Sequence, residues 1–159
     1  MIAAKKVSEQ HGFVGDVTDV NVEPILDVLE KGYIPVVSTV GYDNDNNVYN
    51  INADTAAARI AGELKAECLI SMTDIVGLCK DKDDPTTLIP KVYVSDAPKL
   101  IRDGIISGGM IPKINCCIES IRRGVNKVFI LDGRVPHAIL IEILTDEGLG
   151  TMFVSGNHI

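Results

Sequence analysis

Residues 48–73 read VYNINADTAAARIAGELKAECLISMT, and this stretch indicates the fold class. It begins as an extended strand, because Asn50, Asn52 and Asp54 alternate with other residues and successive strand side chains point to opposite faces. Asp54 is then predicted to open an alanine-rich helix, and the apolar run 68–73 predicts a buried second strand. The apolar positions at helical spacing are Ala57, Ile60, Ala61 and Leu64.

Short apolar runs and helical patterns alternate along the rest of the chain. Further buried strands are predicted at 33–40, 127–131 and 150–154. Further helices are predicted at 21–32, 94–104, 111–124 and 136–148. Ser95 is expected to cap the helix at 94–104, and the polar residues 41–48 are expected at the tip of a hairpin. This alternation predicts an α/β fold, with a mostly parallel, doubly wound sheet sandwiched by helices.

The length, composition and net charge of the chain limit the kinds of fold and partner that it can have. With 159 residues, the chain is expected to form a single domain over 1–159 that buries its own core. Apolar residues make up 46% of the sequence and aromatic residues only 4%, so the core is aliphatic, as suits a parallel sheet covered by helices. The net charge of −7 argues against nucleic acid or an anionic membrane as the partner.

The cysteines and the N-terminus predict a cytoplasmic location. The four cysteines form no CxxC pair and have no histidine at zinc spacing, so reduced thiols are expected: Cys68, Cys79, Cys116 and Cys117. The N-terminal sequence MIAAKKVSEQHG lacks the long apolar segment of a signal peptide, and no run approaches transmembrane length.

Ligands of such sheets bind at the carboxyl ends of the strands, and polar clusters are predicted there. Thr73 and Asp74 follow a buried strand directly, and Gly77 allows close backbone approach; a plain strand-to-loop turn is the alternative. The sequence ISGGMIPK at 106–113 places Lys113 in the first turn of a helix after two glycines. Glycines, free N–H groups and an ammonium can together bind phosphate, although many surface lysines occupy such positions without a ligand.

The third cluster is Asn50, Asn52 and Asp54. Amide side chains both donate and accept hydrogen bonds, which suits a substrate that carries an amide or a carboxylate. The alternative is that one of them caps the helix. A carboxylate at Asp54 could also hold a lysine in position by an ion pair. His137, after Pro136, is expected to be a surface residue at a helix start.

Six blocks of sequence, in order, carry a resemblance to a known family. They are GFVGDVTDVN (12–21), YNINAD (49–54), SMTDIVGL (71–78), DGIISGGMIPK (103–113), VFILDGR (128–134) and TDEGLGTM (145–152). Together they resemble the amino acid kinase family and, within it, the acetylglutamate kinase branch. The resemblance implies a three-layer αβα sandwich around a largely parallel sheet. It also implies ATP-dependent phosphorylation of the side-chain carboxylate of N-acetylglutamate, an early step of arginine biosynthesis.

Site roles follow from the resemblance, residue by residue. Asn50 resembles the asparagine that binds N-acetylglutamate, with Asn52 beside it. Asp54 resembles the aspartate that orients the catalytic lysines, and Lys113 the lysine that stabilises charge on the transferred phosphoryl group. The nucleotide-binding wall is implied at Thr73, Asp74, Gly77, Leu78, Ser107, Gly108, Gly109 and Met110. Magnesium would be carried on the ATP phosphates, so no dedicated metal site in the protein is expected.

The sequence departs from the family pattern in two ways, which bear on whether the chain is active alone and whether arginine inhibits it. The resemblance covers only the C-terminal, nucleotide-binding half, so the phosphate-holding lysine, the glycine-rich loop and the arginine of the N-terminal half are not in this sequence. The chain is therefore expected to be inactive alone and to need a separate N-terminal half; the alternative is a non-catalytic nucleotide-binding module or a relic. In addition, Glu142 and Gly148 match the arginine-inhibited branch, but Phe129 stands where that branch has histidine, which argues against arginine feedback.

Overall fold

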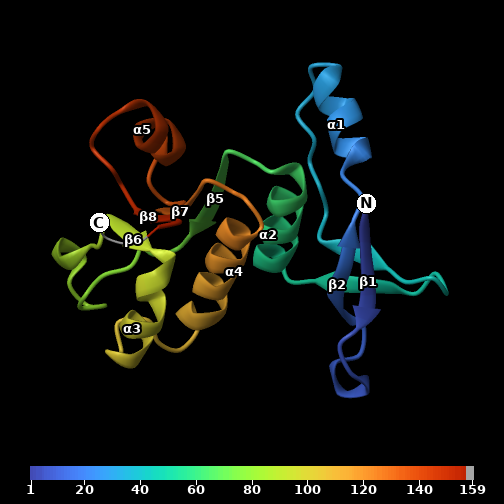
Figure 1. Ribbon diagram of the computed structural model, residues 1–159, viewed down its shortest axis with the longest axis horizontal. Helices are drawn as coiled ribbons and strands as arrows, with labels where there is room; N and C mark the ends of the chain where they lie inside the picture. Colours follow the sequence, from blue (N-terminus) through green and yellow to red (C-terminus); the bar gives the residue numbers. More distant parts are fainter. Residues whose placement is uncertain (157–159) are drawn as a thin grey trace. The chain divides into compact units, whose positions relative to one another are not determined.

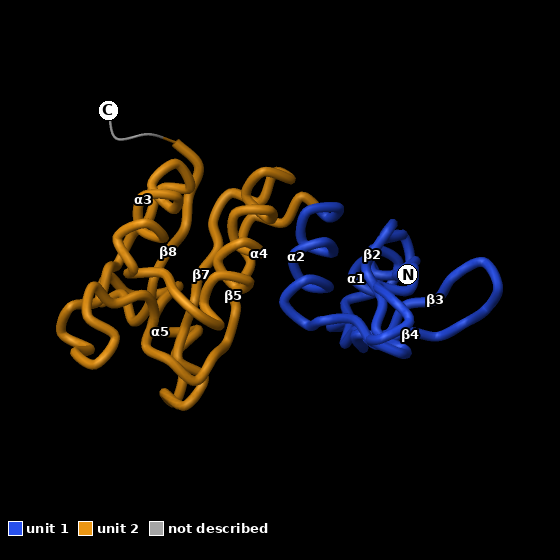
Figure 2. Tube along the Cα trace, turned by 90° about the horizontal axis from the view of Figure 1, so that it is seen from below, with its two compact units in different colours: residues 1–64 blue, residues 65–159 orange. Residues whose placement is uncertain are grey.

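A computed structural model describes residues 1–156, and the chain divides into two compact units, Met1–Leu64 and Lys65–Ile159 (Figures 1 and 2). Each unit has its own sheet and its own helices, and each is described by itself. Within the described residues, no helix is long and apolar enough to span a bilayer. All four cysteines are free thiols, and burial raises the pKa of Cys68 and Cys79.

The first unit is built on a closed ring of four strands, in the order β1-β2-β4-β3. These strands are β1 (Ile2–Lys6), β2 (Val14–Val20), β3 (Val40–Tyr42) and β4 (Val48–Ile51). Pairs β1–β2 and β3–β4 are antiparallel, whereas β1–β3 and β2–β4 are parallel. Two helices complete the unit: α1 (Glu23–Glu30) and α2 (Ala53–Leu64).

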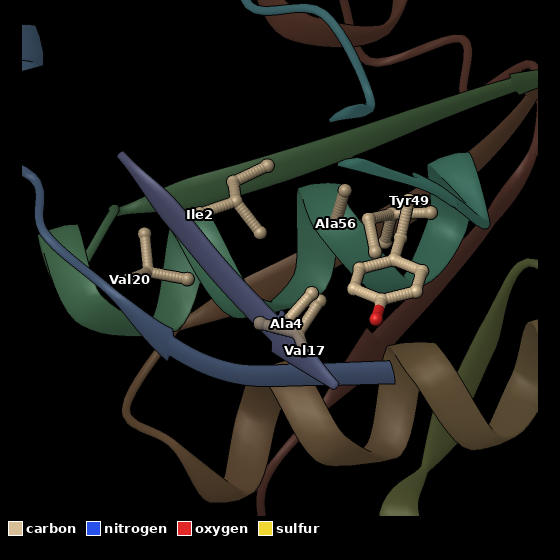
Figure 3. Close-up of a cluster of buried hydrophobic side chains, with 7 residues drawn as sticks. Ile2, Ala4, Val17, Val20, Tyr49 and Ala56 are labelled. Carbon is tan, nitrogen blue, oxygen red and sulfur yellow. The ribbon is translucent and has the colours of Figure 1, made fainter. Parts of the chain in front are cut away.

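A small apolar core joins helix α2 to the ring (Figure 3). Its buried members are Ile2, Ala4, Val17, Val20, Tyr49, Ile51 and Ala56. The ring is tight, because a Cβ at Gly15 would lie 2.5 Å from the Tyr49 Cβ. Arg59 of α2 adds polar contacts, donating hydrogen bonds to the Val17 and Thr18 carbonyls at 3.2 and 3.1 Å.

The hairpin expected at 41–48 is confirmed, and Asp43 closes it. Its carboxylate accepts hydrogen bonds from the backbone N–H of Asp45 and Asn47, the Asn47 amide and the Tyr49 hydroxyl, at 2.7–2.9 Å. The Asn47 and Tyr49 side chains hold the pKa of Asp43 at about 2. One charged side chain thus ties the turn to the buried Tyr49.

The prediction of a buried strand at 33–40 is wrong. Only Val40 belongs to a strand, and Ile34 and Val36 are 90% and 95% exposed. Pro35 has no N–H to donate to a ladder, and no strand pairs with 34–38 among the described residues. An apolar run becomes a buried strand only when neighbouring strands and helices cover it.

Three local expectations are also corrected. Helix α2 begins at Ala53, one residue before Asp54, and it buries Ala56 and Ala58 while Ala57 is exposed. The buried side of α2 is therefore rotated around the helix axis relative to the stripe that the sequence spacing predicted. Ser95 caps no helix: Asp96 is the N-cap residue of α3 (Ala97–Arg102), and the Ser95 hydroxyl bonds to the Gly156 carbonyl at 3.2 Å.

The second unit contains a four-stranded sheet in the order β5-β7-β8-β6. The strands are β5 (Cys68–Thr73), β6 (Lys91–Tyr93), β7 (Lys127–Asp132) and β8 (Thr151–Val154). Pairs β5–β7 and β6–β8 are parallel, and β7–β8 is antiparallel. The α/β class is confirmed, although the strands form two sheets of mixed direction rather than one largely parallel sheet.

Helices cover the central strand β7 from both sides. Val128 to Leu131 are all buried, which requires cover on both faces because their side chains alternate. Helix α4 (Met110–Arg122) contacts β7 and β8, and α5 (Ala138–Leu144) contacts β7. Helix α4 ends before Gly124, which adopts a φ of +107°. His137 is the exposed N-cap residue of α5, as expected.

We expect Gly150→Ala to lower the free energy of unfolding by about 1–3 kcal/mol, because overpacking at a rigid position forces the backbone to move. A Cβ there would overlap the Ile130 carbonyl oxygen and lie 2.5 Å from Leu131 Cδ2, so strands β7 and β8 would have to separate. Urea denaturation followed by circular dichroism measures the change.

Gly109→Ala is the matched control. A Cβ at Gly109 meets nothing within 4 Å, and its φ of −64° suits alanine, so its unfolding curve should match that of the unchanged chain. Equal curves for both variants would contradict the tight approach of β8 to β7.

Candidate functional site

The parallel pairing of β5 and β7 brings two strand ends to one edge of the second sheet. Thr73, the last residue of β5, pairs with Asp132, the last residue of β7. Beyond this pair, the Gly133 N–H donates to the Thr73 carbonyl at 2.7 Å. The segments after Thr73 and after Asp132 therefore leave the sheet side by side, where ligands of α/β sheets bind.

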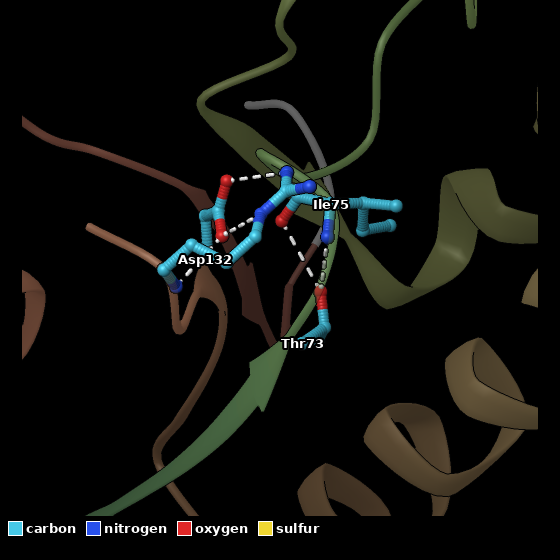
Figure 4. A network of polar contacts seen from close by, with 4 residues as sticks. Thr73, Ile75 and Asp132 are labelled. Carbon is cyan, nitrogen blue, oxygen red and sulfur yellow. Dashed lines mark hydrogen bonds and ion pairs between the residues drawn. The ribbon is translucent and has the colours of Figure 1, made fainter.

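Asp132 and Arg134 form a two-point ion pair at this edge (Figure 4). Arg134 Nε donates to Asp132 Oδ1 at 2.9 Å and Nη2 to Oδ2 at 2.8 Å, and the Arg134 backbone N–H adds a bond at 2.9 Å. Hydrogen bonds from Arg134 hold the pKa of Asp132 at about 2. The Asp132 side chain is 8% exposed and that of Arg134 is 66% exposed, so the guanidinium is fixed but open to solvent.

The loop after β5 is held by hydroxyl groups. The Thr73 hydroxyl accepts from the Ile75 N–H and donates to the Ile75 carbonyl, at 3.0 and 3.1 Å. Farther along, the fully buried Thr151 hydroxyl accepts from the Leu78 N–H and donates to the Ile89 carbonyl, both at 2.8 Å. The Ile89 N–H also donates to the Leu78 carbonyl at 2.8 Å, so Thr151 ties this already paired segment to the start of β8.

A cavity of about 290 Å³ lies at this edge, within the second unit. Its walls are mostly apolar, with one carboxylate and two cations among them. The lining residues are Asp74, Ile75, Val76, Gly77, Leu78, Cys79, Lys82, Pro85, Ile105, Met110 and Arg134. Apolar walls with a few charged groups suit a flat base joined to an anionic chain.

The cavity gathers part of the residue set that the sequence assigned to nucleotide binding. Four of these residues line the cavity: Asp74, Gly77, Leu78 and Met110. Thr73 does not line it, but its hydroxyl bonds to Ile75 and so holds the loop after β5. The other expected members, Ser107, Gly108 and Gly109, are exposed before helix α4 and do not line the cavity.

The start of α4 offers fewer backbone donors than expected. The Met110 and Ile111 N–H groups donate to the Ser107 and Gly108 carbonyls at 3.1 and 3.2 Å, and Pro112 has no N–H. An anion near this helix end would therefore depend strongly on side-chain cations. Lys113 supplies one: its half-buried side chain comes within 3.4 Å of the Ser71 hydroxyl of β5.

The other predicted residues lie in the first unit. Asn52 Oδ1 accepts from the Thr55 N–H at 3.1 Å, which caps helix α2. Asp54 follows in the first turn of α2. Asn50, exposed on β4, has no side-chain hydrogen bond recorded within the described residues. Since Lys113 belongs to the second unit, its pairing with Asp54 stays a prediction.

Sequence reasoning did not single out Arg134 or Thr151. Both lie within blocks of the resemblance, VFILDGR and TDEGLGTM, so those blocks were the available signal. Two further residues, one of them in the block VFILDGR, bear on arginine feedback. Phe129 is buried within β7, and the Glu142 carboxylate accepts from the Leu149 N–H at 2.6 Å, closing the loop after α5.

Comparison with known sequences defines the class of protein. The amino acid kinase family matches residues 2–132, which is most of the chain, so the chain belongs to the amino acid kinase family. Acetylglutamate kinases are among its most similar relatives. Those of Brachyspira hyodysenteriae and Thermosynechococcus vestitus are 56% and 51% identical over 96% and 98% of this chain. The chain covers 53% and 52% of them, about half of their length.

Solved structures share the fold. The protein smu.665 from Streptococcus mutans aligns with a TM-score of 0.78 at 31% identity, over 96% of this chain and 56% of its own. N-acetylglutamate synthase from Neisseria gonorrhoeae aligns with a TM-score of 0.84 at 23% identity, over 96% and 36% of the two chains. At that identity the second match supports the α/β fold alone.

We expect Thr151→Val to lower the free energy of unfolding by about 1–3 kcal/mol, because it leaves the buried Leu78 N–H unsatisfied and removes a partner of the part-buried Ile89 carbonyl. Valine keeps the shape of the side chain, so the change isolates the two hydrogen bonds to Leu78 and Ile89. Hydrogen exchange at the Leu78 amide should also quicken.

Thr151→Ser is the control, since serine keeps the hydroxyl and loses only a methyl group. Its Leu78 amide should stay protected. If Thr151→Val leaves both stability and Leu78 exchange unchanged, the hydroxyl does not hold the cavity loop.

Proposed function

We propose that this chain supplies the nucleotide-binding half of an ATP-dependent kinase that phosphorylates the side-chain carboxylate of N-acetylglutamate. One observation carries the proposal: most residues that line the cavity at the ends of β5 and β7 belong to the sequence blocks that resemble acetylglutamate kinases. The apolar wall would take the adenine.

The chemistry requires positioning and charge stabilisation more than covalent help from the protein. Lys113 would stabilise negative charge on the phosphoryl group during transfer, and Asp54 would orient the catalytic lysines. Asn50 would bind N-acetylglutamate through its amide, with Asn52 beside it. Asn52 can do so only through its amide N–H groups, because its oxygen caps helix α2.

Magnesium would be carried by the ATP phosphates and would neutralise part of their charge. One carboxylate, Asp74, lines the cavity beside Lys82 and Arg134, so a magnesium ion carried on ATP would find an oxygen donor there. Asp74 would accept a hydrogen bond from metal-bound water rather than form a metal cage.

Activity would also need the half of the fold that the relatives carry outside the matched part, which a separate N-terminal half could supply. Their length supports this, since the chain spans about half of them. The exposed apolar residues of the first unit also support it: Tyr33, Ile34 and Val36 are 67%, 90% and 95% exposed. The free thiols favour a cytoplasmic location, where cysteines stay reduced.

We expect the full chain to bind ATP–Mg weakly in isothermal titration calorimetry and to show no turnover of N-acetylglutamate alone. Mixed with the unmatched half of the Brachyspira hyodysenteriae kinase, it should form acetylglutamyl phosphate. Lys113→Ala should lower kcat in that mixture by roughly 100- to 1000-fold, the typical effect of removing one group that stabilises transition-state charge.

Lys99→Ala is the matched control, because Lys99 is an exposed lysine on α3. Its kcat should equal that of the unchanged mixture. ATP binding without turnover in any mixture would favour the non-catalytic nucleotide-binding module. Turnover by the chain alone, above Lys113→Ala, would show that the second half is not required.

A second prediction concerns Asn50. In the active mixture, Asn50→Ala should raise KM for N-acetylglutamate roughly ten- to a hundredfold, the effect of losing one or two hydrogen bonds to a charged ligand. KM for ATP and the melting temperature should hardly change, because Asp43 and not Asn50 closes the hairpin.

Asn52→Ala provides the contrast. Removing that helix cap should lower the free energy of unfolding by about 1 kcal/mol. An Asn50→Ala protein that melts early and keeps its KM for N-acetylglutamate would assign Asn50 to the fold instead.

A further inference from the structure

Arg134 is a cation of the cavity to which neither the sequence motifs nor the kinase chemistry above assigns a role. We propose that Arg134, held in place by Asp132, binds the phosphate chain of the nucleotide and makes the site select nucleoside polyphosphates over nucleosides. This inference rests on the proposed function, because it concerns the same cavity. It adds a specificity-determining residue, Arg134, and a positioning residue, Asp132.

The first argument is electrostatic. The chain carries a net charge of −7, so its overall field repels an anionic ligand. At the cavity this repulsion is offset locally, since Lys82 and Arg134 stand against the carboxylates of Asp74 in the lining and Asp132 behind Arg134. A local pair of cations in an acidic protein is what retention of a polyphosphate requires.

The second argument is the geometry of the guanidinium. Its recorded bonds to Asp132 use Nε and Nη2, two of the three nitrogens, and no partner of Nη1 is recorded within residues 1–156. A guanidinium has five N–H donors, so those on Nη1 remain for a ligand. Because Asp132 already fixes the side chain, a phosphate would not have to order it, and this lowers the entropic cost of binding.

The third argument is placement. Arg134 follows Asp132, which pairs with Thr73 at the end of β5. Lys113 reaches Ser71, two residues earlier in the same strand and therefore roughly 7 Å along it. The two cations thus approach one strand end from different segments, the turn after β7 and helix α4. A phosphate chain between them would find the donors that the start of α4 does not supply, since its Met110 and Ile111 N–H groups are already bonded.

The test compares ATP with adenosine by isothermal titration calorimetry on the full chain. Arg134→Gln should weaken ATP binding about tenfold or more, the loss expected for charge-assisted hydrogen bonds, and leave adenosine binding unchanged. The ATP affinity of Arg134→Lys should lie between those of Arg134→Gln and the unchanged chain, because lysine keeps the charge and loses the two-point bond to Asp132. Arg102→Gln, an exposed arginine on α3, is the matched control for net charge and should bind both ligands normally.

Arg134→Gln leaves the Asp132 carboxylate buried without its cation, so its melting temperature must be measured as well. The double variant Arg134→Gln/Asp132→Asn removes both charges together and should show the same selective loss of ATP affinity. Equal ATP affinity in the folded double variant and the unchanged chain would overturn the inference and leave the proposed function intact. An equal loss of affinity for ATP and for adenosine would also overturn it, because Arg134 would then contact the base or the ribose. Absence of ATP binding in the unchanged chain would overturn the proposed function together with this inference.

Discussion

The parallel pairing of β5 with β7, in the register that sets Thr73 beside Asp132, is the constraint on which the candidate site depends. A parallel ladder forces two strands that are far apart in sequence to end at the same edge. The polar residues that follow each strand, Asp74 on one side and Arg134 on the other, therefore line one cavity. A shift of the register by one residue would turn the side chains of each strand to opposite faces and separate these groups.

Buried polar groups then shape the edge that the pairing creates. The Thr151 hydroxyl ties the paired Leu78 and Ile89 segments to β8, and the Asp132 carboxylate holds Arg134. Each makes more than one hydrogen bond, and a buried polar group that is hydrogen-bonded costs little stability. Neither contacts the proposed ligand, yet both decide where the lining residues stand. This separation of supporting residues from lining residues is typical of sites that bind rigidly.

The first unit shows which structural features a local sequence pattern can predict and which it cannot. The hairpin at 41–48 formed where its polar residues predicted, because Asp43 satisfies the turn from within the same segment. The apolar run at 33–40 did not become a buried strand, because burial depends on neighbours that a run of sequence does not specify. The same limit applies to Ala57, which has the right spacing but an exposed position, since helix spacing defines a stripe and not the surface that covers it.

The sequence by itself determined the α/β class, the positions of helices α1, α2, α4 and α5, and the strands β5, β7 and β8, because their signals are local periodicity, capping and chain-breaking residues. It also identified Asp74, Gly77, Leu78 and Met110, which the cavity brings together. Only the tertiary structure decided that the strands divide into two sheets, that Asn52 caps α2, and that Arg134 and Thr151 belong to the cavity and its support. The reason is physical: strand pairing and side-chain hydrogen bonds join residues distant in sequence, and their partners are chosen by packing in three dimensions and not by any pattern along the chain.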